Sequence, residues 1–155
     1  MIKIKKGLNI PISGTPEDKI TDFKNPRSVA LVGSDYHGLK PAMLVTEGEK
    51  VKIGQPLFKD KKNPGVIFSS PGGGVVESIN RGAKRALQSV VIEISDNEEE
   101  ISFLSIKTDD LSNQTQSSIR DNLIKSGLWT SFRTRPFSKI PTIDSDPKSI
   151  FINCM

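Results

Sequence analysis

Turn-forming residues recur at short intervals between Met43 and Ile94, and this spacing limits the fold more than any other feature of the chain. No stretch in this region keeps the spacing of apolar residues that an amphipathic helix requires. The clearest turn is Asn63-Pro64-Gly65, and β-branched stretches follow it at Gly74–Ile79 and Leu87–Ile94. With 12 glycines and 10 prolines among 155 residues, the composition favours many short strands over a helical bundle. The sequence therefore predicts a mainly β fold.

Further elements are expected on either side of this region. The apolar run Ser28–Gly33 has the composition of a buried strand. The residues before it are punctuated by Pro11, Gly14 and Pro16, which indicates an extended arm. The chain ends in Ser149–Met155, whose composition is also typical of a buried strand. Because no turn or further element follows that strand, we expect the chain to be a fragment of a longer protein.

One helix is predicted after the β region. The polar stretch Ser112–Ser126 carries apolar residues at a one-faced helical spacing, which indicates a helix of about four turns. Asp110 or Ser112 is suited to cap its start. Gly127 is suited to end it, because glycine readily takes the left-handed conformation that follows many helices.

Composition and charge exclude several functional classes. No apolar run approaches the roughly 20 residues that cross a bilayer, and the first residues lack the apolar core of a signal peptide, so we expect a cytoplasmic chain. Cys154 is the only cysteine and His37 the only histidine, which leaves no cluster for a metal ion or an iron–sulfur centre. The net charge is +4, and only 6% of the residues are aromatic. Basic and aromatic residues do not alternate along any stretch, so we expect no nucleic-acid partner.

Two glycine-containing segments resemble the biotinyl/lipoyl-type sandwich domain. They are Glu47–Leu57 and Ser70–Val76, and they lie at the distance that the resemblance requires. Gly48 and Gly54 permit tight turns with positive φ, and Gly74 permits close approach of two strands. The resemblance implies a small barrel-sandwich hybrid fold.

The same resemblance raises the hypothesis of a lipoyl or biotin carrier. Carriers hold the cofactor on a lysine at the tip of the hairpin between the two segments. Counted back from Ser70-Pro71, that position is Asn63, while Lys61 and Lys62 are displaced along the strand. A displaced side chain in a strand need not stand at the tip. A solvated hairpin is the alternative interpretation of these lysines.

A second resemblance covers nearly the whole chain. Ile4–Leu8, Asn80–Arg85, Ser126–Thr130 and Arg133–Lys139 together resemble the family of A subunits of the bacterial Na+-translocating NADH:quinone reductases. This implies a cofactor-free peripheral subunit of a membrane complex that oxidises NADH, reduces ubiquinone and exports Na+. Its partners would be the other subunits of the complex and quinone. FMN, FAD and iron–sulfur centres would be carried by those other subunits. Its place would be the cytoplasmic side of the bacterial inner membrane.

That family is distantly similar to the NADH-binding flavoprotein subunit of complex I, whose phosphate-binding loop reads SGLRGRGGAGFPT. Where that loop has glycines, this chain has Thr130, Phe132, Arg133 and Arg135. Glycines let backbone N–H groups close around phosphate oxygens. The resemblance therefore implies a scaffold that no longer binds flavin or NADH. A flavin- or NADH-binding electron-transfer domain is the alternative.

Basic residues in two places are candidates for docking to a partner. Arg81, Lys84 and Arg85 form a cluster on a turn between strands, suited to an acidic partner subunit or to anionic lipid headgroups. Arg133 and Arg135 follow the predicted helix. A solvated turn is the alternative for the cluster. The neighbouring aromatic residues, Trp129 and Phe132, are expected in the core.

Together these features predict an α+β fold, mainly β with some α, in three parts. Residues 1–28 form an amino-terminal extended arm. Residues 29–107 form the barrel-sandwich hybrid domain. Residues 108–155 form a helix, a loop and the first strand of a truncated second domain of α/β type.

Overall fold

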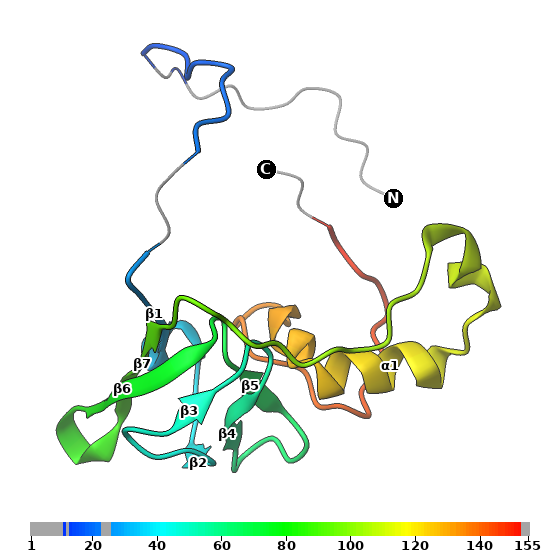
Figure 1. Ribbon diagram of the computed structural model, residues 1–155. Coiled ribbons are helices and arrows are strands. Elements are labelled where there is room, and N and C mark those ends of the chain that lie inside the picture. Colours follow the sequence, from blue (N-terminus) through cyan, green and yellow to red (C-terminus); the bar gives the residue numbers. More distant parts are fainter. Residues whose placement is uncertain (1–10, 12, 23–25, 153–155) are drawn as a thin grey trace.

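The computed structural model describes residues 11, 13–22 and 26–152 (Figure 1). The described residues before Ser28 are exposed and contain neither helix nor strand. The rest of the expected arm, including the alternation of Ile2 and Ile4 with lysines, lies outside the described residues.

An antiparallel four-stranded sheet forms one half of the sandwich. Its order is β1 (Ser28–Val32), β7 (Leu87–Ile94), β6 (Gly74–Arg81) and β3 (Lys50–Val51). The hairpin of β6 and β7 runs the length of the sheet, from the pair Gly74 and Ile94 to the pair Arg81 and Leu87. The many β-branched residues, among them Val75, Val76 and Val90–Ile92, explain why these strands form here.

A three-stranded sheet forms the other half. Its order is β2 (Pro41–Met43), β4 (Pro56–Asp60) and β5 (Ile67–Ser69). Phe58 and Phe68 are almost fully buried, and their rings stack with centroids 4.6 Å apart. The two sheets enclose a single core, to which Val51, Leu57, Val66, Val76, Val90 and Ile92 also contribute.

The glycines of the resemblance have the roles expected of them. Gly48 and Gly54 have φ values of 82° and 81°, which glycine adopts without steric cost. Gly74 lies so close to β7 that a Cβ would overlap the carbonyl oxygen of Glu93. The prediction of close strand approach is therefore confirmed.

The prediction that Ser28–Gly33 is a buried strand is wrong in one respect. β1 forms, but it lies at the edge of its sheet, and its residues alternate between exposed and half-buried. Val32 is 40% exposed. One face of an antiparallel sheet in a sandwich packs on the core and the other faces solvent, so Val29 and Leu31 contact the core and the residues between them do not.

The region after the sheets is helical in two short pieces. A 3-10 helix, η3, covers Thr108–Asn113, and the α-helix α1 covers Gln116–Lys125. The Thr115 hydroxyl accepts a hydrogen bond from the Ser118 amide at 3.2 Å and caps α1. The other 3-10 turns are η1 (Gly33–Asp35), η2 (Ala83–Arg85) and η4 (Leu128–Ser131).

The predicted helix over Ser112–Ser126 therefore starts too early, and neither Asp110 nor Ser112 is its cap. Polar side chains over 112–115 compete for backbone hydrogen bonds and favour turns and caps over a helix interior. The predicted helix end is confirmed, because Gly127 has a left-handed φ of 79°.

Over residues 149–152, the carboxyl-terminal segment is not the buried strand that its composition indicates, and residues 153–155 lie outside the described residues. Ile150, Phe151 and Ile152 are 66%, 90% and 84% exposed and belong to no strand. A strand needs a neighbour for its backbone groups, and no strand pairs with these residues in the described part of the chain.

Candidate functional site

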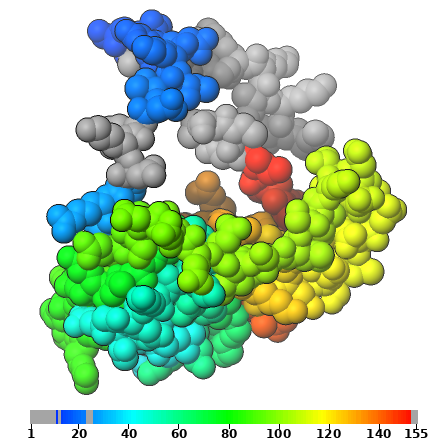
Figure 2. All heavy atoms as spheres, viewed as in Figure 1, coloured from blue at the N-terminus to red at the C-terminus, as the bar shows by residue number. Residues whose placement is uncertain are grey.

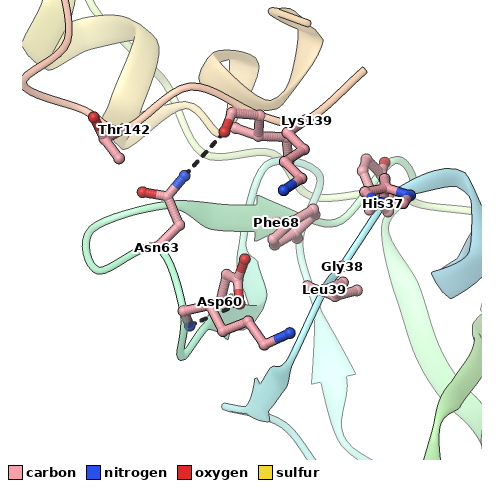
Figure 3. A pocket seen from close by; sticks show the side chains of 11 residues that line it. His37, Gly38, Leu39, Asp60, Asn63, Phe68, Lys139 and Thr142 are labelled. Atoms are coloured by element: carbon pink, nitrogen blue, oxygen red, sulfur yellow. Dashed lines mark hydrogen bonds between the residues drawn. The ribbon is translucent and has the colours of Figure 1, made fainter. Parts of the chain in front are cut away.

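The hairpin tip between β4 and β5, where a carrier would hold its modified lysine, is closed in this protein. Asn63 is 8% exposed, and its Nδ2 donates to the carbonyl oxygens of Ile140 at 3.3 Å and Pro141 at 3.0 Å (Figure 3). A Cβ on Gly65 would lie 2.6 Å from Cδ1 of Ile143. The tip is therefore packed against residues 140–143.

The lysines near the tip do not take its place. Lys59, Lys61 and Lys62 are exposed. The Lys61 amide donates to the Lys40 carbonyl at 2.8 Å, and the Lys62 amide donates to Oδ1 of Asp60 at 2.9 Å. These bonds fix the lysine backbone before the tip is reached, which supports the interpretation of a solvated hairpin.

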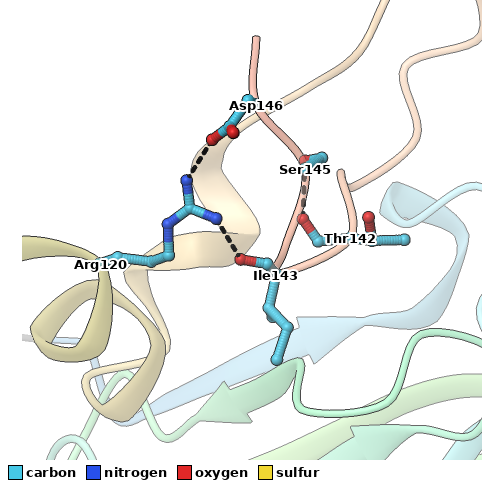
Figure 4. Close-up of polar contacts among 5 residues, drawn as sticks. All are labelled: Arg120, Thr142, Ile143, Ser145 and Asp146. Atoms are coloured by element: carbon cyan, nitrogen blue, oxygen red, sulfur yellow. Dashed lines mark hydrogen bonds and ion pairs between the residues drawn. The ribbon is translucent and has the colours of Figure 1, made fainter. Parts of the chain in front are cut away.

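Residues 139–146, which we call the strap, are held on their other side by the helical part of the chain. Nε1 of Trp129 donates to the Pro141 carbonyl at 3.0 Å. Arg120 of α1 donates from Nη1 to the Ile143 carbonyl at 2.8 Å and from Nη2 to Oδ1 of Asp146 at 2.7 Å (Figure 4). The strap therefore lies between the hairpin tip and α1 and is bonded to both.

The Asn63 contacts predict a pH-dependent effect of an isosteric change. Asn63→Asp would place a carboxylate against two carbonyl oxygens, so the pKa of the new carboxyl group would rise above its ordinary value of about 3.9. A raised folded-state pKa means that the protonated form, which can still donate, is favoured. We expect a loss of about 2 kcal/mol in the free energy of unfolding at pH 7 and a smaller loss near pH 4.

Urea unfolding at the two pH values measures this difference, with Asn63→Ala as the control. The alanine variant loses the same donors but carries no charge, so we expect a loss of about 1 to 2 kcal/mol at both pH values. If Asn63→Asp is as stable as the wild type at pH 7, the side chain at the tip does not contact the carbonyl groups of the strap.

The segment aligned with the phosphate-binding loop forms the turn η4, whose backbone bonds to itself. The Thr130 amide donates to the Gly127 carbonyl, and the Phe132 amide donates to the Trp129 carbonyl, each at 3.2 Å. Phosphate binding in such loops needs free N–H groups that converge on the ligand. The amides of Thr130 and Phe132 are therefore not free to bind a phosphate group.

Arg133 covers one side of this turn. Its Nη1 donates to the Thr130 carbonyl, and its guanidinium carbon lies 5.1 Å from the centre of the Tyr36 ring. Burial raises the pKa of Tyr36, and the positive charge of Arg133 opposes that rise. Arg133 therefore has structural contacts in addition to its candidate role in docking.

The expectations for the two aromatic residues of this turn have different outcomes. Trp129 is 7% exposed and belongs to the core, as predicted. Phe132 is 36% exposed, so its predicted burial is wrong. Its ring meets the Trp129 ring edge-on at 5.2 Å. Trp129 fills the position in the core, and Phe132 packs against the side of Trp129 that faces solvent.

The candidate docking cations lie in two separate places. Arg81, Lys84 and Arg85 are exposed at the end of the β6–β7 hairpin, which projects at the lower left of Figure 2. Arg133 and Arg135 are exposed in the loop after η4, away from that hairpin in Figure 1. The ion pairs of the described chain join other residues, namely Arg27 with Glu93, Lys52 with Glu99 and Arg120 with Asp146.

An apolar cleft of about 520 Å³ lies between the sandwich and η4. Its apolar walls include Leu31, Ile53, Phe68, Phe103 and Leu128. Ser69 also lines it, and the Ser69 hydroxyl is buried without a hydrogen-bond partner among the described residues. Sequence reasoning missed this cleft because its walls come from distant segments, and no local pattern marks them.

Metal-binding and membrane-spanning features are absent from the described ranges. Over residues 11, 13–22 and 26–152, no three His, Cys, Asp or Glu side chains gather as a metal site would require. His37 is exposed in a turn. The helices of this part fall short of the length and apolarity that a membrane span requires.

Two family models match the chain in succession. Residues 2–95 match the NqrA N-terminal barrel-sandwich hybrid domain, and residues 114–155 match the NqrA second alpha/beta domain. The chain belongs to the NqrA family, the A subunits of the Na+-translocating NADH-quinone reductases. The family resemblance and the predicted barrel-sandwich hybrid fold are thereby confirmed.

Relatives in the NqrA family match the chain from end to end. The A subunit of the Na(+)-translocating NADH-quinone reductase from Pseudomonas aeruginosa is 54% identical over 155 residues, which are 100% of this chain and 35% of that protein. The proteins of the same name from Pasteurella multocida and Neisseria meningitidis are 56% and 54% identical, with 100% of this chain and 34% of each protein covered. The chain spans about a third of the length of these relatives.

The NqrA family match also shows which parts the strap joins. Asn63 lies in the matched barrel-sandwich hybrid domain, whereas residues 139–146 lie in the match to the second alpha/beta domain. The closed hairpin tip is therefore a contact between two domains of the family.

Proposed function

We propose that this chain is part of a peripheral, cofactor-free subunit of a membrane complex that oxidises NADH, reduces ubiquinone and exports Na+. The observation that carries the proposal is family membership, since relatives named as A subunits of the Na+-translocating NADH-quinone reductase match the whole chain at 54% to 56% identity. FMN, FAD and iron–sulfur centres would then belong to other subunits, and the chain would lie on the cytoplasmic side of the bacterial inner membrane.

The self-bonded turn at η4 supports the cofactor-free part of this proposal. We expect no thermal shift of the full-length subunit with FMN or NADH at concentrations up to about 1 mM, since a ligand that binds the folded state must raise its melting temperature. A saturable shift, or a yellow purified protein, would contradict it. Ligand density against Thr130–Arg135 in soaked crystals would do the same.

The closed tip argues against the carrier alternative. Asn63 replaces the modified lysine, and its contacts with Ile140 and Pro141 leave no free arm. Intact-mass measurement after co-expression with lipoyl- and biotin-attaching enzymes is expected to show an unmodified chain. A mass increase that maps to Lys61 or Lys62 would restore the carrier hypothesis.

A quinone contact is a second candidate function, and the apolar cleft beside η4 favours it. A quinone site combines an apolar slot with one or two polar groups, and Tyr36, Thr130 and Ser131 bring hydroxyl groups to the lining of the cleft. We propose this cleft as the place of such a contact. Crosslinking by a photoreactive ubiquinone should label Phe103 or Leu128, and labelling confined to other residues would exclude the cleft.

The candidate docking residues and the domain limits remain proposals as well. Arg81, Lys84, Arg85, Arg133 and Arg135 would face partner subunits. The arm would end at residue 28, and the barrel-sandwich domain would end at residue 107. An isolated bridge between Ile53 and Glu100 holds part of the connecting segment to the first domain. This contact supports a domain boundary that lies after Glu100.

A further inference from the structure

The end of the β6–β7 hairpin combines two features that residue preferences normally separate. Lys84 and Arg85 have φ values of 53° and 60°. They are the central residues of a turn in which the Ala86 amide donates to the Ala83 carbonyl at 3.2 Å. Positive φ at both central positions of a hairpin turn favours asparagine and glycine. Long cationic side chains therefore stand where other residues would be more stable.

Hydrogen bonds around the turn hold this conformation. The Gly82 amide donates to the Ala86 carbonyl at 2.8 Å, and the Arg85 amide donates to the Gly82 carbonyl at 3.1 Å. Nη1 of Arg81 lies 3.4 Å from the Arg85 carbonyl oxygen, to which it donates. Left-handed conformations of this kind persist where the surrounding structure enforces them, and they cluster at functional sites.

The cationic side chains at this tip are exposed and make no ion pair with the described residues. The other residues of the turn, Ala83 and Ala86, are small, so the tip carries no large apolar group. Figure 2 shows the tip projecting from the body of the molecule. The turn therefore presents a group of cations whose backbone positions are fixed.

We propose that this tip binds a cluster of carboxylates on the surface of a folded partner protein. Carboxylates of a folded protein have fixed positions, so they bind more tightly to cations that are also held in fixed directions. Anionic lipid headgroups are fluid and attract any flexible basic segment, so a strained turn adds nothing to their binding. The lack of a large apolar side chain also disfavours insertion at a membrane surface.

This inference rests on the proposed function, because the partner is taken to be another subunit of the same complex. It deepens that function in one respect. The contact made by Arg81, Lys84 and Arg85 is assigned to protein and not to lipid.

The test uses a variant in which stability and docking should change in opposite directions. Lys84→Asn with Arg85→Gly removes two charges and supplies the residues that the turn prefers. We expect the full-length subunit with this double change to melt about 4 °C higher than the wild type. We also expect its co-purification with the membrane-bound subunits to fall about tenfold at an ionic strength of about 0.15 M.

Two control variants separate charge from conformation and from position. Lys84→Arg with Arg85→Lys keeps both charges on the same turn and should co-purify like the wild type. Lys59→Asn with Lys61→Asn removes the same charge from exposed positions on the β4–β5 hairpin and should also co-purify normally. Vesicles of phosphatidylcholine and phosphatidylserine test the lipid alternative directly.

The outcomes distinguish this inference from the function on which it rests. If the Lys84→Asn and Arg85→Gly variant co-purifies as well as the wild type, the docking role is overturned and the proposed function stands. If the wild type binds the vesicles and this variant does not, the tip binds lipid, and the proposal of a protein partner is overturned. A variant that melts lower and assembles poorly would show a purely structural turn. Failure of the wild-type subunit to co-purify would overturn both proposals.

Discussion

Replacing Gly74 with alanine is expected to disrupt the four-stranded sheet, with a loss of more than about 3 kcal/mol in the free energy of unfolding. Gly74 begins β6 opposite Ile94 of β7, and a Cβ there would overlap the Glu93 carbonyl oxygen and lie 2.9 Å from its carbonyl carbon. Because the clashing atoms belong to the backbone, only separation of the strands would relieve the overlap. Urea unfolding followed by circular dichroism measures the loss.

Gly48→Ala is the matched control for this change. Gly48 differs from Gly74 in having a left-handed φ of 82°, and a Cβ there would meet nothing within 4 Å. We expect a loss of about 1 kcal/mol from the left-handed conformation alone. A loss for Gly74→Ala no larger than that for Gly48→Ala would show that the close approach of β6 to β7 does not require Gly74.

Trp129→Ala is expected to cost about 3 to 5 kcal/mol of folding free energy and to release the strap. Trp129 is 7% exposed, its Nε1 holds the Pro141 carbonyl, and the Arg120 guanidinium carbon lies 5.7 Å from the centre of its ring. Removal of the ring leaves a cavity and takes away one of the two donors to the Pro141 carbonyl, the other being Nδ2 of Asn63. Circular dichroism in urea measures the loss of stability, and hydrogen exchange of the strap amides measures its release.

Trp129→Phe separates the two parts of that effect. The phenyl ring keeps most of the packing and loses the donor to Pro141, so we expect a loss of about 1 to 2 kcal/mol. Circular dichroism is the appropriate probe, because the chain has a single tryptophan. Wild-type protection of the strap amides in both variants would show that Trp129 does not hold the strap.

The closed hairpin tip distinguishes this barrel-sandwich hybrid from a carrier domain. In a carrier the tip must stay free, so that a modified lysine can move between sites. Here Asn63 binds carbonyl groups of the strap, and Arg120 and Trp129 hold the strap from the other side. The point of the fold that would carry a mobile group has become a contact between domains.

Local sequence was sufficient for the elements whose cause is local. The positive φ of Gly48, Gly54 and Gly127 follows from the lack of a side chain. The strands of the β6–β7 hairpin follow from their high content of β-branched residues. Because such preferences act over a few residues, the sequence by itself determined the mainly β architecture, the position of the turns, and the cationic residues on one of them.

Only the tertiary structure decided what depends on residues far apart in the chain. It placed β1 at a sheet edge, left Phe132 outside Trp129, and opened the apolar cleft beside η4. It also closed the hairpin tip, through a hydrogen bond between Asn63 and Pro141, which are 78 residues apart. Burial and pairing are properties of neighbours in space, and a single sequence does not state which distant segments become neighbours.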